Sequence, residues 1–377
     1  MGILWRCVLR PHLSKSAHGK AFHRFGRGKP ERLAEPWSAR ALRTYGAIQH
    51  QYYDSTVQLY RHPFQAGAYD HLWPFANVWM ATCALSRIGG LDPSDLRARL
   101  SALSRYSPSS STTPHSEGPL GFQSAPSPPL GPGGDTYYDD NSWILLALLD
   151  QHSITGDTLC VGTAKRIFEF LLSGWSRGES WSYAGGIRWA EPAWSLTRNT
   201  CSNAPTAAGA AWLYLLTKDP QYLEWATRIY DWTRTTLLTK EYLYADSVAP
   251  GGSVDPAVWS YNQGSMIGAG VRLFHATREE RYLEEAISTA QTCCEYFEAP
   301  DRLSRQGAAF NAIYFSNLLA LKDYSPELVA KHFEQARNYC IAMSDLEYDK
   351  PDGVSSGGIN LTAPMVTLYA ALAGSGK

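Results

Sequence analysis

The fold is decided by residues 200–236, which read TCSNAPTAAGAAWLYLLTKDPQYLEWATRIYDWTRTT. Apolar residues recur at the three- and four-residue spacing of a helix face in both halves of this stretch. Asp219 and Pro220 lie between the halves, and a cap residue followed by Pro at the first helical position marks a helix start. The stretch therefore predicts two helices, at 200–216 and 221–236, joined by a tight turn as a helical hairpin.

The same apolar rhythm continues along most of the chain. Ser325 and Pro326 repeat the start signal. Residues 260–263, Ser-Tyr-Asn-Gln, have the pattern of a capping box, in which Gln263 is expected to reach back to the cap residue. Strand signals are few, and the best are 183–187 and 242–246. To within a few residues, the helices are predicted at 38–60, 73–88, 94–104, 140–152, 160–174, 200–216, 221–236, 261–276, 280–297, 306–322, 326–343 and 362–373.

These paired helices predict an all-α fold, an (α/α)6 barrel of helical hairpins. In this architecture the inner helices begin at one face, where the preceding loops form a cleft. A helical solenoid is the competing layout. No strict repeat of roughly 20–50 residues is found, which counts against the solenoid. We therefore expect residues 35–377 to form a single domain.

Two segments fall outside the helical rhythm. The first 30 residues carry seven Lys or Arg and no acid, and such a segment is compatible with a transit-like peptide, a start codon placed too early or a disordered tail. We expect residues 1–34 to be disordered. Residues 107–135, SPSSSTTPHSEGPLGFQSAPSPPLGPGGD, are rich in Ser, Pro and Gly and are predicted to be a long flexible loop inserted within the domain.

Several classes of protein are disfavoured by composition. The net charge is -1, so no broad field is expected for nucleic acid or anionic lipid. Arg6 and Arg10 interrupt the short apolar run near the N-terminus, which leaves no recognisable secretory signal, and no stretch approaches the roughly 18 apolar residues of a membrane span. The seven cysteines are odd in number and lack disulfide or zinc spacing. A cytoplasmic location is the resulting expectation.

Aromatic residues are abundant, with 13 Trp and 22 Tyr among 377 residues. Indole and phenol rings can stack on the apolar faces of sugars while their polar tips remain in water. A core rich in Trp is the competing explanation for any one of these rings. The composition therefore allows a carbohydrate site without locating it.

The sharpest local motif is DTYYDDNSWILLALLD at residues 135–150, where two adjacent carboxylates, Asp139 and Asp140, stand between a loop and a helix. Acidic residues are favoured at a helix N-terminus as caps of backbone N–H groups, which is the simpler reading. The same pair also suits glycoside hydrolysis, which requires two carboxyl groups, about 5–5.5 Å apart in retaining enzymes. One ionised carboxylate would keep its neighbour protonated, and the two would titrate together.

Two more predicted helix starts concentrate amide and aromatic side chains. They are RNTCSN at 198–203 and WSYNQG at 259–264. If all three starts lie on one face, they line one polar, aromatic cleft, which sugar hydroxyls require. Local capping explains Ser260 and Gln263 but not Trp259 or Tyr261.

The sequence resembles glycoside hydrolase family 76, the endo-α-1,6-mannanases and their fungal cell-wall relatives. The resemblance covers roughly residues 40–340. It is carried by YYDDNSWILLALLD, RNTCSNAPTAAGAAWLYLLTKDPQYLEWATRIYDWT, YLYADSV and WSYNQGSMIGAGVRLFHATREERYLEEAI, in that order. The resemblance implies an (α/α)6 catalytic domain that cleaves α-1,6-mannan or related α-mannosides internally and with retention. It implies no metal and no organic cofactor.

Carried over residue by residue, the resemblance makes Asp139 the nucleophile and Asp140 the general acid/base. It places further residues in or beside the sugar-binding cleft, and composition adds two tryptophans as stacking platforms: Asn199, Asn203, Asp246, Tyr261, Asn262, Gln263, Trp189 and Trp194. Residues 310–316, FNAIYFS, depart from the family pattern, which has Lys and a following Arg there. The family is also usually exported.

Three alternatives remain open. Another (α/α)6 sugar enzyme, such as an unsaturated glucuronyl hydrolase or a sugar 2-epimerase, is the first. Epimerases of that kind work through His pairs, but no His lies in residues 135–150, 198–203 or 259–264. His71 and His275, near predicted helix ends, are the histidines to check for such a role. A non-catalytic mannan-binding barrel would keep the same cleft. A transglycosylase would use the same residues, and a sugar hydroxyl would then intercept the intermediate in place of water. The oligomeric state is left open.

Overall fold

The computed structural model describes residues 35–92, 94–108, 118–178, 182–299, 301–347 and 358–375. Trp37–Lys377 forms one compact unit, and Met1–Pro36 is a separate one. The prediction of a disordered segment at 1–34 lies outside the described residues. The fold below is that of the larger unit.

The described part of this unit contains twelve α-helices. They are α3 (Trp37–Tyr52), α4 (Leu72–Arg87), α5 (Ser94–Ala102), α6 (Tyr138–Thr155), α7 (Thr158–Ser173), α8 (Thr200–Thr217), α9 (Pro220–Leu237), α10 (Ser260–Thr277), α11 (Glu280–Glu298), α12 (Ala308–Leu318), α13 (Pro326–Glu347) and α14 (Ile359–Ser375). Two 3-10 turns, η1 (Leu103–Tyr106) and η2 (Leu319–Leu321), extend α5 and α12. The strands are β1 (Tyr53–Asp54), β2 (Leu59–Tyr60), β3 (Arg198–Asn199), β4 (Ser247–Val248) and β5 (Val254–Asp255).

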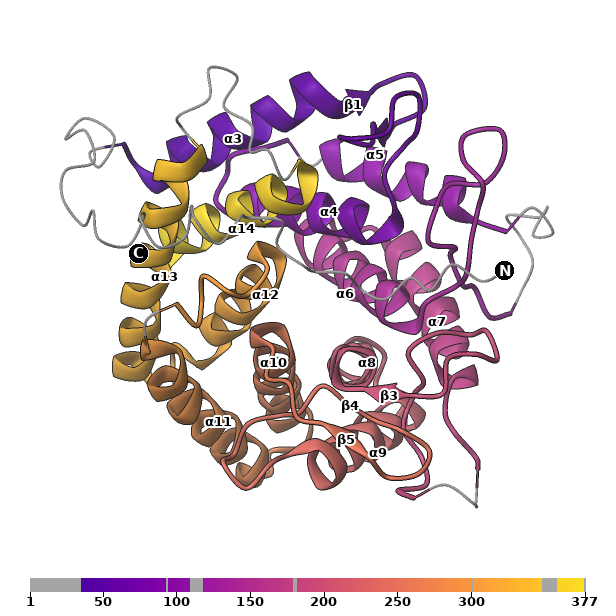
Figure 1. Ribbon diagram of the computed structural model, residues 1–377, viewed down its shortest axis with the longest axis vertical. Helices are drawn as coiled ribbons and strands as arrows, with labels where there is room; N and C mark the ends of the chain where they lie inside the picture. The colour runs from indigo at the N-terminus through magenta and orange to yellow at the C-terminus, as the bar shows by residue number, and fades with distance from the viewer. Residues whose placement is uncertain are drawn as a thin grey trace. The chain divides into compact units, whose positions relative to one another are not determined.

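Every second helix belongs to an inner ring. In this ring α4 packs on α6, α6 on α8, α8 on α10, α10 on α12 and α12 on α14, and α14 closes the ring by packing on α4 (Figure 1). The other six described helices lie outside the ring (Figure 1). This closed arrangement confirms the predicted (α/α)6 barrel and excludes an open solenoid.

Burial distinguishes the two rings. The inner helix α10 buries every residue from Ser260 to Val271, whereas the outer helix α11 buries a stripe at the spacing of one face. Close inner packing requires small residues, because a Cβ at Gly264 of α10 would lie 2.5 Å from the Tyr314 Cα of α12. The inner ring is therefore the centre of the core.

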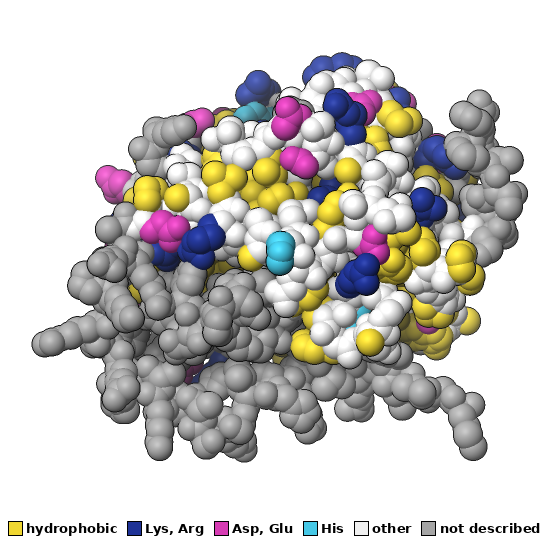
Figure 2. Space-filling model, turned by 90° about the horizontal axis from the view of Figure 1, so that it is seen from above, with side chains coloured by type: hydrophobic (Ala, Val, Ile, Leu, Met, Phe, Trp, Pro, Cys, Tyr) yellow, Lys and Arg dark blue, Asp and Glu magenta, His cyan; other side chains and the backbone are white. Residues whose placement is uncertain are grey.

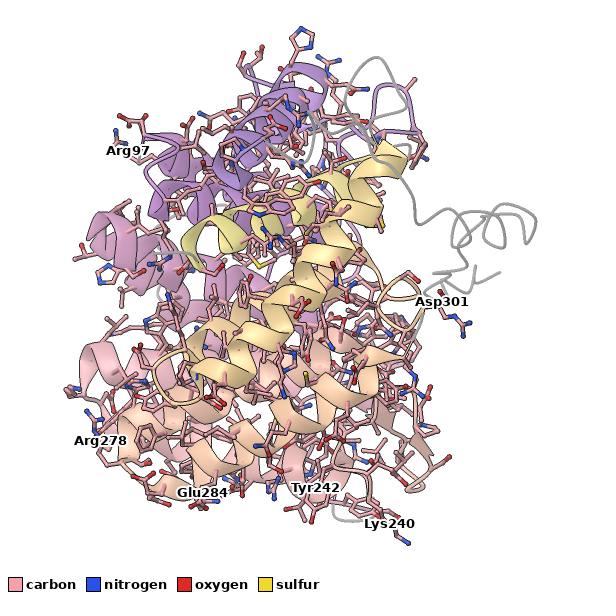
Figure 3. The ribbon with its side chains drawn as sticks, turned by 90° about the vertical axis from the view of Figure 1, so that its left-hand side faces the viewer. Arg97, Lys240, Tyr242, Arg278, Glu284 and Asp301 are labelled. Carbon is pink, nitrogen blue, oxygen red and sulfur yellow. The ribbon has the colours of Figure 1, made fainter. Side chains whose placement is uncertain are left out.

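The outer surface carries charges of both signs. Acidic and basic side chains are interspersed on the face shown in Figure 2. Arg278, Glu284 and Lys240 point outward at the edge of the molecule in Figure 3. Within the part of the chain that is described, no helix has both the length and the apolar character to span a membrane.

Short backbone ladders tie together the loops that precede inner helices. The antiparallel sheet β3-β4-β5 joins the start of α8 to the loop before α10. The Thr200 N–H donates to the Asp246 carbonyl at 2.8 Å, and the Tyr138 N–H donates to the Trp189 carbonyl at 2.9 Å. The starts of α6, α8 and α10 are thereby held with their loops at one end of the barrel.

Three local predictions are corrected. The helix predicted at 38–60 ends at Tyr52, since the next residues form the hairpin β1-β2. The strands predicted at 183–187 and 242–246 are absent, although Ile187 and Tyr244 each make a single bridge. Residues 260–263 do not form a capping box: the cap residue of α10 is Trp259, and the Ser260 hydroxyl donates to the Asn311 side chain at 2.9 Å.

Part of the segment predicted as an inserted loop at 107–135 lies outside the described residues, and the part from 118 onward is described. Residues 118–135 are described as irregular chain that packs against the barrel, with Phe122 and Ala125 buried. The Asn141 amide of α6 bonds both backbone groups of Phe122, at 2.8 and 3.0 Å. Two side-chain hydrogen bonds thus fix this part of the segment beside the start of α6.

Candidate active site

Asp139 and Asp140 occupy the first turn of α6 and are partly buried. The cap residue is Tyr137, and its side chain makes no capping hydrogen bond. Asp139 Oδ1 accepts the Asp140 N–H at 2.9 Å, which satisfies one of the free donors of the first turn. A helix-capping role therefore explains the hydrogen bond of Asp139 Oδ1 but not the other oxygens of the two carboxyl groups.

The second oxygen of Asp139 has two donors from distant parts of the chain. Trp189 Nε1–H donates to Oδ2 at 2.8 Å, and Cys201 Sγ–H donates to the same atom at 3.6 Å. Three donors therefore hold the Asp139 carboxylate in one orientation. Hydrogen bonds to the charged form favour that form.

The Asp140 carboxyl group has a different environment. Among the described residues, none donates a hydrogen bond to it. Burial and then the charge of Asp139 raise the pKa of Asp140 well above its ordinary value. Burial also raises the pKa of Asp139, to about 6, although hydrogen bonds from Trp189, Asp140 and Cys201 oppose this rise. Near neutral pH the pair is expected to carry one charge, on Asp139.

A third carboxylate, Asp246, stands at the loop between α9 and β4. Asn199 Nδ2 lies 3.5 Å from its Oδ2, and Asn262 Nδ2 lies 3.4 Å from its Oδ1. Burial first, and then the charge of Asp255, raise the pKa of Asp246 to about 6, and the charge of Asp139 adds to this rise. Asp246 is therefore close enough to the acidic pair to share its electrostatic field.

The two asparagines beside Asp246 have unused acceptors. Oδ1 of Asn199 and Oδ1 of Asn262 are buried, and neither has a hydrogen-bond partner in the described part of the chain. Buried polar atoms in native proteins usually have a partner. Together with the Asp246 carboxylate, they offer acceptors for the hydroxyl groups of a ligand.

Asn203 and Gln263 lie beneath the site, and both are fully buried. The Asn203 amide accepts the Ile187 N–H at 2.7 Å and donates to the Ile187 carbonyl at 2.9 Å. Gln263 makes the same pair of bonds with Tyr244, each at 2.8 Å. These amides hold the loops that carry the site. The isolated β-bridges of Ile187 and Tyr244 lie at the same two residues that the amides bind.

Aromatic side chains line the barrel beside the acidic pair. Tyr261 stacks on Phe310, with ring centroids 3.9 Å apart and planes within 9°. Trp143 lies 6.3 Å from Tyr261 and 5.7 Å from Trp73. The four rings come from inner helices α4, α6, α10 and α12, and they form a continuous aromatic row.

A second aromatic group surrounds Trp189. The Trp189 and Trp194 rings lie 6.0 Å apart, and Tyr137 lies 5.1 Å from Trp189 and 6.3 Å from Trp194. Trp194 is 56% exposed. Trp189 joins this group directly to Asp139 through its indole N–H.

Sequence reasoning missed several residues of this site. Cys201 stood in the quoted motif RNTCSN without a role, yet its thiol reaches Asp139. Phe310 was noted only as part of a departure from a family pattern, and its stack on Tyr261 was not foreseen. For Trp73 and Trp143, the available signal was their position near the start of an inner helix, in the first turn of α4 and the second turn of α6.

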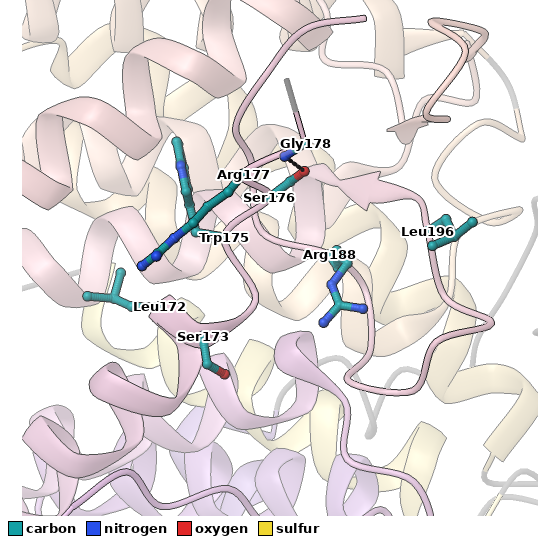
Figure 4. Close-up of a pocket in the computed structure, with 8 residues that line it drawn as sticks. All are labelled: Leu172, Ser173, Trp175, Ser176, Arg177, Gly178, Arg188 and Leu196. Atoms are coloured by element: carbon teal, nitrogen blue, oxygen red, sulfur yellow. Dashed lines mark hydrogen bonds between the residues drawn. The ribbon is translucent and has the colours of Figure 1, made fainter. Parts of the chain in front are cut away.

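A separate pocket of about 410 Å³ lies beside α7 (Figure 4). Arg177 and Arg188 stand among its lining residues, with Trp175 and Leu196. The Arg188 guanidinium is 5.9 Å from the Tyr138 ring. None of the predicted site residues lines this pocket, so it is distinct from the acidic pair.

Comparison with known proteins places the chain in a family. The sequence profile described as Glycosyl hydrolase family 76 matches residues 38–353. The chain belongs to glycosyl hydrolase family 76. The predicted resemblance is thereby confirmed over most of the chain.

Solved structures share the barrel of this family 76 chain. A family 76 mannosidase from Bacteroides thetaiotaomicron has a TM-score of 0.73 at 22% identity, covering 89% of this chain and 98% of that one. The GH76A α-1,6-mannanase of a Salegentibacter species has a TM-score of 0.70 at 22% identity, covering 90% and 99%. At these identities the likeness shows the fold.

Curated relatives are matched over shorter stretches. Mannan endo-1,6-α-mannosidase DCW1 of Candida glabrata is 33% identical over 118 residues, which is 29% of this chain and 26% of that protein. The DCW1 protein of Candida albicans is 27% identical over 144 residues, or 36% and 31%. The matches thus span about a quarter to a third of these relatives.

Proposed function

We propose that this family 76 protein hydrolyses α-1,6-linked mannan at internal bonds with retention of anomeric configuration. The observation that carries the proposal is the unequal environment of two adjacent carboxyl groups. Three donors hold Asp139, whereas the described residues offer none to Asp140. Because the donors favour an ionised Asp139, that charge keeps Asp140 protonated.

Each carboxyl group then has one role in each half of the reaction. The ionised Asp139 attacks the anomeric carbon while Asp140 gives its proton to the departing glycosidic oxygen. A covalent glycosyl ester on Asp139 results. Asp140, now ionised, takes a proton from water, the water oxygen attacks the same carbon, and the Asp139 carboxylate leaves. Two displacements restore the original configuration.

The neighbouring groups suit a sugar. Asp246 and the free acceptors of Asn199 and Asn262 would accept hydroxyl protons. The stacked Tyr261 and the exposed Trp194 would offer ring faces to sugar carbons. Asn203 and Gln263 would act through the loops that they hold.

A structural relative supports both α-1,6-mannan as the substrate and the adjacent aspartates as the catalytic pair. A variant of the Salegentibacter mannanase with two consecutive aspartates replaced by alanine is described as inactive and was solved with α-1,6-mannotetrose. The DCW1 relatives are named as mannan endo-1,6-α-mannosidases. These names point to α-1,6-mannan as the first substrate to test.

The test is incubation with linear α-1,6-mannan, product sizing, and detection of the first anomer by NMR. We expect short oligosaccharides released in the α configuration. Asp139→Asn and Asp140→Asn should each lower kcat by about a thousandfold or more while binding is largely kept. Initial release of the β anomer would refute retention, and full activity of both variants would refute the pair.

The same assay separates the alternatives. With an added acceptor oligosaccharide, elongated products in place of free reducing ends would indicate a transglycosylase. A parent protein that binds mannan but releases no product would indicate a binding protein. Either result would overturn the proposed hydrolysis.

A further inference from the structure

Three side chains of the types that can bind a metal ion lie together on the loop between β2 and α4, outside every motif assigned above. One ligand atom from each of His62, Asp70 and His71 lies within 4.8 Å of the others. We propose that this triad binds one divalent transition-metal ion, with zinc as the best fit. The proposal is independent of the proposed function, because none of the three residues takes part in that reaction.

Asp70 supplies the strongest reason. Its side chain is almost fully buried, with the residue 3% exposed. Oδ1 accepts the His71 N–H at 2.9 Å, but Oδ2 is buried and has no hydrogen-bond partner among the residues that the structure describes. A buried carboxylate oxygen without a donor is costly, and a bound cation would satisfy it.

The backbone around the triad is held in place. The His62 N–H donates to the Ala68 carbonyl at 2.8 Å, and the Asp70 N–H donates to the Tyr60 carbonyl at 2.8 Å. The Tyr106 hydroxyl donates to the Asp70 carbonyl at 2.9 Å. This framework folds the loop so that His62 and Asp70 meet, although seven residues separate them in the chain.

The two imidazoles complete the site. The His62 and His71 rings lie 5.9 Å apart at 75°, and His71 Nδ1 is 3.8 Å from Asp70 Oδ1. Ligand atoms around tetrahedral zinc lie about 3.4 Å apart, since each is about 2.0–2.1 Å from the ion. Side-chain rotations that move the ligand atoms by about an ångström would therefore form the site.

The ligand types decide the class of metal. Two imidazoles and one carboxylate suit zinc and its first-row neighbours, whereas calcium and magnesium prefer oxygen ligands. Three protein ligands leave one tetrahedral position open to water. The site would thus hold an ion without closing around it.

The ion would anchor the start of an inner helix. His71 is the cap residue of α4, and Trp73 in the first turn contacts Trp143 of α6 in the aromatic row. Binding would link the loop before α4 to this helix start. We therefore expect a role in stability of the barrel rather than in the chemical step.

The test uses the full chain without an affinity tag, freed of metal by a chelator. Zn²⁺ binding is measured by competition with a coloured chelator, and Co²⁺ by its visible absorption, which reports the ligand geometry. We expect one ion bound with micromolar or tighter affinity, and a Tm that rises on adding Zn²⁺. In the double variant His62→Ala/His71→Ala, this ion and the rise in Tm should be lost.

The matched control is His50→Ala, which removes an exposed histidine of α3. It should keep both the ion and the rise in Tm. Four of the ten histidines lie outside the described residues, so the difference between the double variant and the control is the decisive quantity. Equal binding by these two variants would overturn the proposal.

Asp70→Asn gives a second and gentler change, because it keeps the shape of the buried side chain. It should weaken Zn²⁺ binding by about tenfold or more and remove the response of the Tm to Zn²⁺. If the variant bound Zn²⁺ as the parent does, the carboxylate would not be a ligand and the triad would be refuted.

Discussion

At the scale of single residues, the acidic pair shows how surroundings can divide two identical side chains. Asp139 receives donors from α6, from the loop before α8 and from α8 itself. Asp140 gains only burial and a charged neighbour. The difference in role therefore comes from what surrounds each group.

Because burial and the Asp139 charge disfavour ionisation of Asp140, we expect Asp140→Asn to raise the stability of the fold. An acid whose pKa is raised in the folded state binds its proton more tightly there, so stability falls as pH rises above the ordinary value near 3.8. The Asn variant avoids that loss at neutral pH. A gain of about 1 kcal/mol would raise the Tm by roughly 2 °C, measured by calorimetry.

The pH dependence provides the control for this variant. Near pH 4 the Asp140 proton is retained in the folded parent and little stability is lost, so the Tm values of parent and variant should converge there. A gain that is equally large at pH 4 and pH 7 would contradict an origin in the Asp140 charge. Loss of activity in the more stable variant is expected, since the proton donor is gone.

Replacing Cys201 is expected to change the acidic limb of the pH profile of kcat/KM. Activity should fall as pH drops through about 6, because burial raises the pKa of Asp139 to about 6 and the protonated group cannot attack. Cys201→Ala removes one donor to that carboxylate. The acidic midpoint of kcat/KM should then move upward by roughly half a unit, equivalent to about 0.7 kcal/mol.

Cys201→Ser tests whether the donor matters, since a hydroxyl can replace the thiol. It should leave the acidic midpoint near that of the parent. Cys294→Ala, on the outer helix α11, should also leave it unchanged. If Cys201→Ala left the midpoint unchanged while lowering activity, the thiol would be a packing group alone.

At the scale of elements, the inner helices depend on close contact. Gly264→Ala would place a Cβ 2.5 Å from the Tyr314 Cα, which is too close without a shift of α10 or α12. We expect a loss of about 1–3 kcal/mol, seen as a lower midpoint in urea. The matched control is Gly162→Ala in α7, where a Cβ meets nothing within 4 Å.

Gly162→Ala should be neutral or raise stability by up to about 1 kcal/mol, because alanine is the better helix former. A similar response of the two variants would show that the contact between α10 and α12 tolerates a methyl group.

Local periodicity was enough to predict the helices, since each must bury a face whatever its neighbours are. It failed after Tyr52, where apolar and polar residues alternate ambiguously and the hairpin β1-β2 forms instead. The capping box failed because its hydroxyl binds Asn311, 51 residues away. Sequence patterns within a few residues carry no information about partners so far away in the chain.

The site was predictable where its residues stand at helix starts, as Asp139, Tyr261 and Asn262 do. The contact of Cys201 with Asp139 was not, because it joins residues 62 positions apart and depends on how α8 packs on α6. The triad of His62, Asp70 and His71 likewise required the fold of its loop. His71 alone had drawn attention in the sequence, as a histidine near a helix end.

At the scale of the whole larger unit, alternation of inner and outer helices places every inner start at the same end. The acidic pair, the asparagines beside Asp246 and the aromatic row come from five inner helices or the loops before them. No single hairpin holds the site. Its geometry therefore depends on the spacing between neighbouring hairpins.

Ring closure by α14 has a consequence for synthesis. Among the described helices, α14 is the last to leave the ribosome, and it packs on both α3 and α4, which are made first. Until it does, apolar flanks of the earliest helices have no neighbour and can bind other chains. We infer that nascent protein lacking α14 is the form most prone to aggregate and most in need of chaperones.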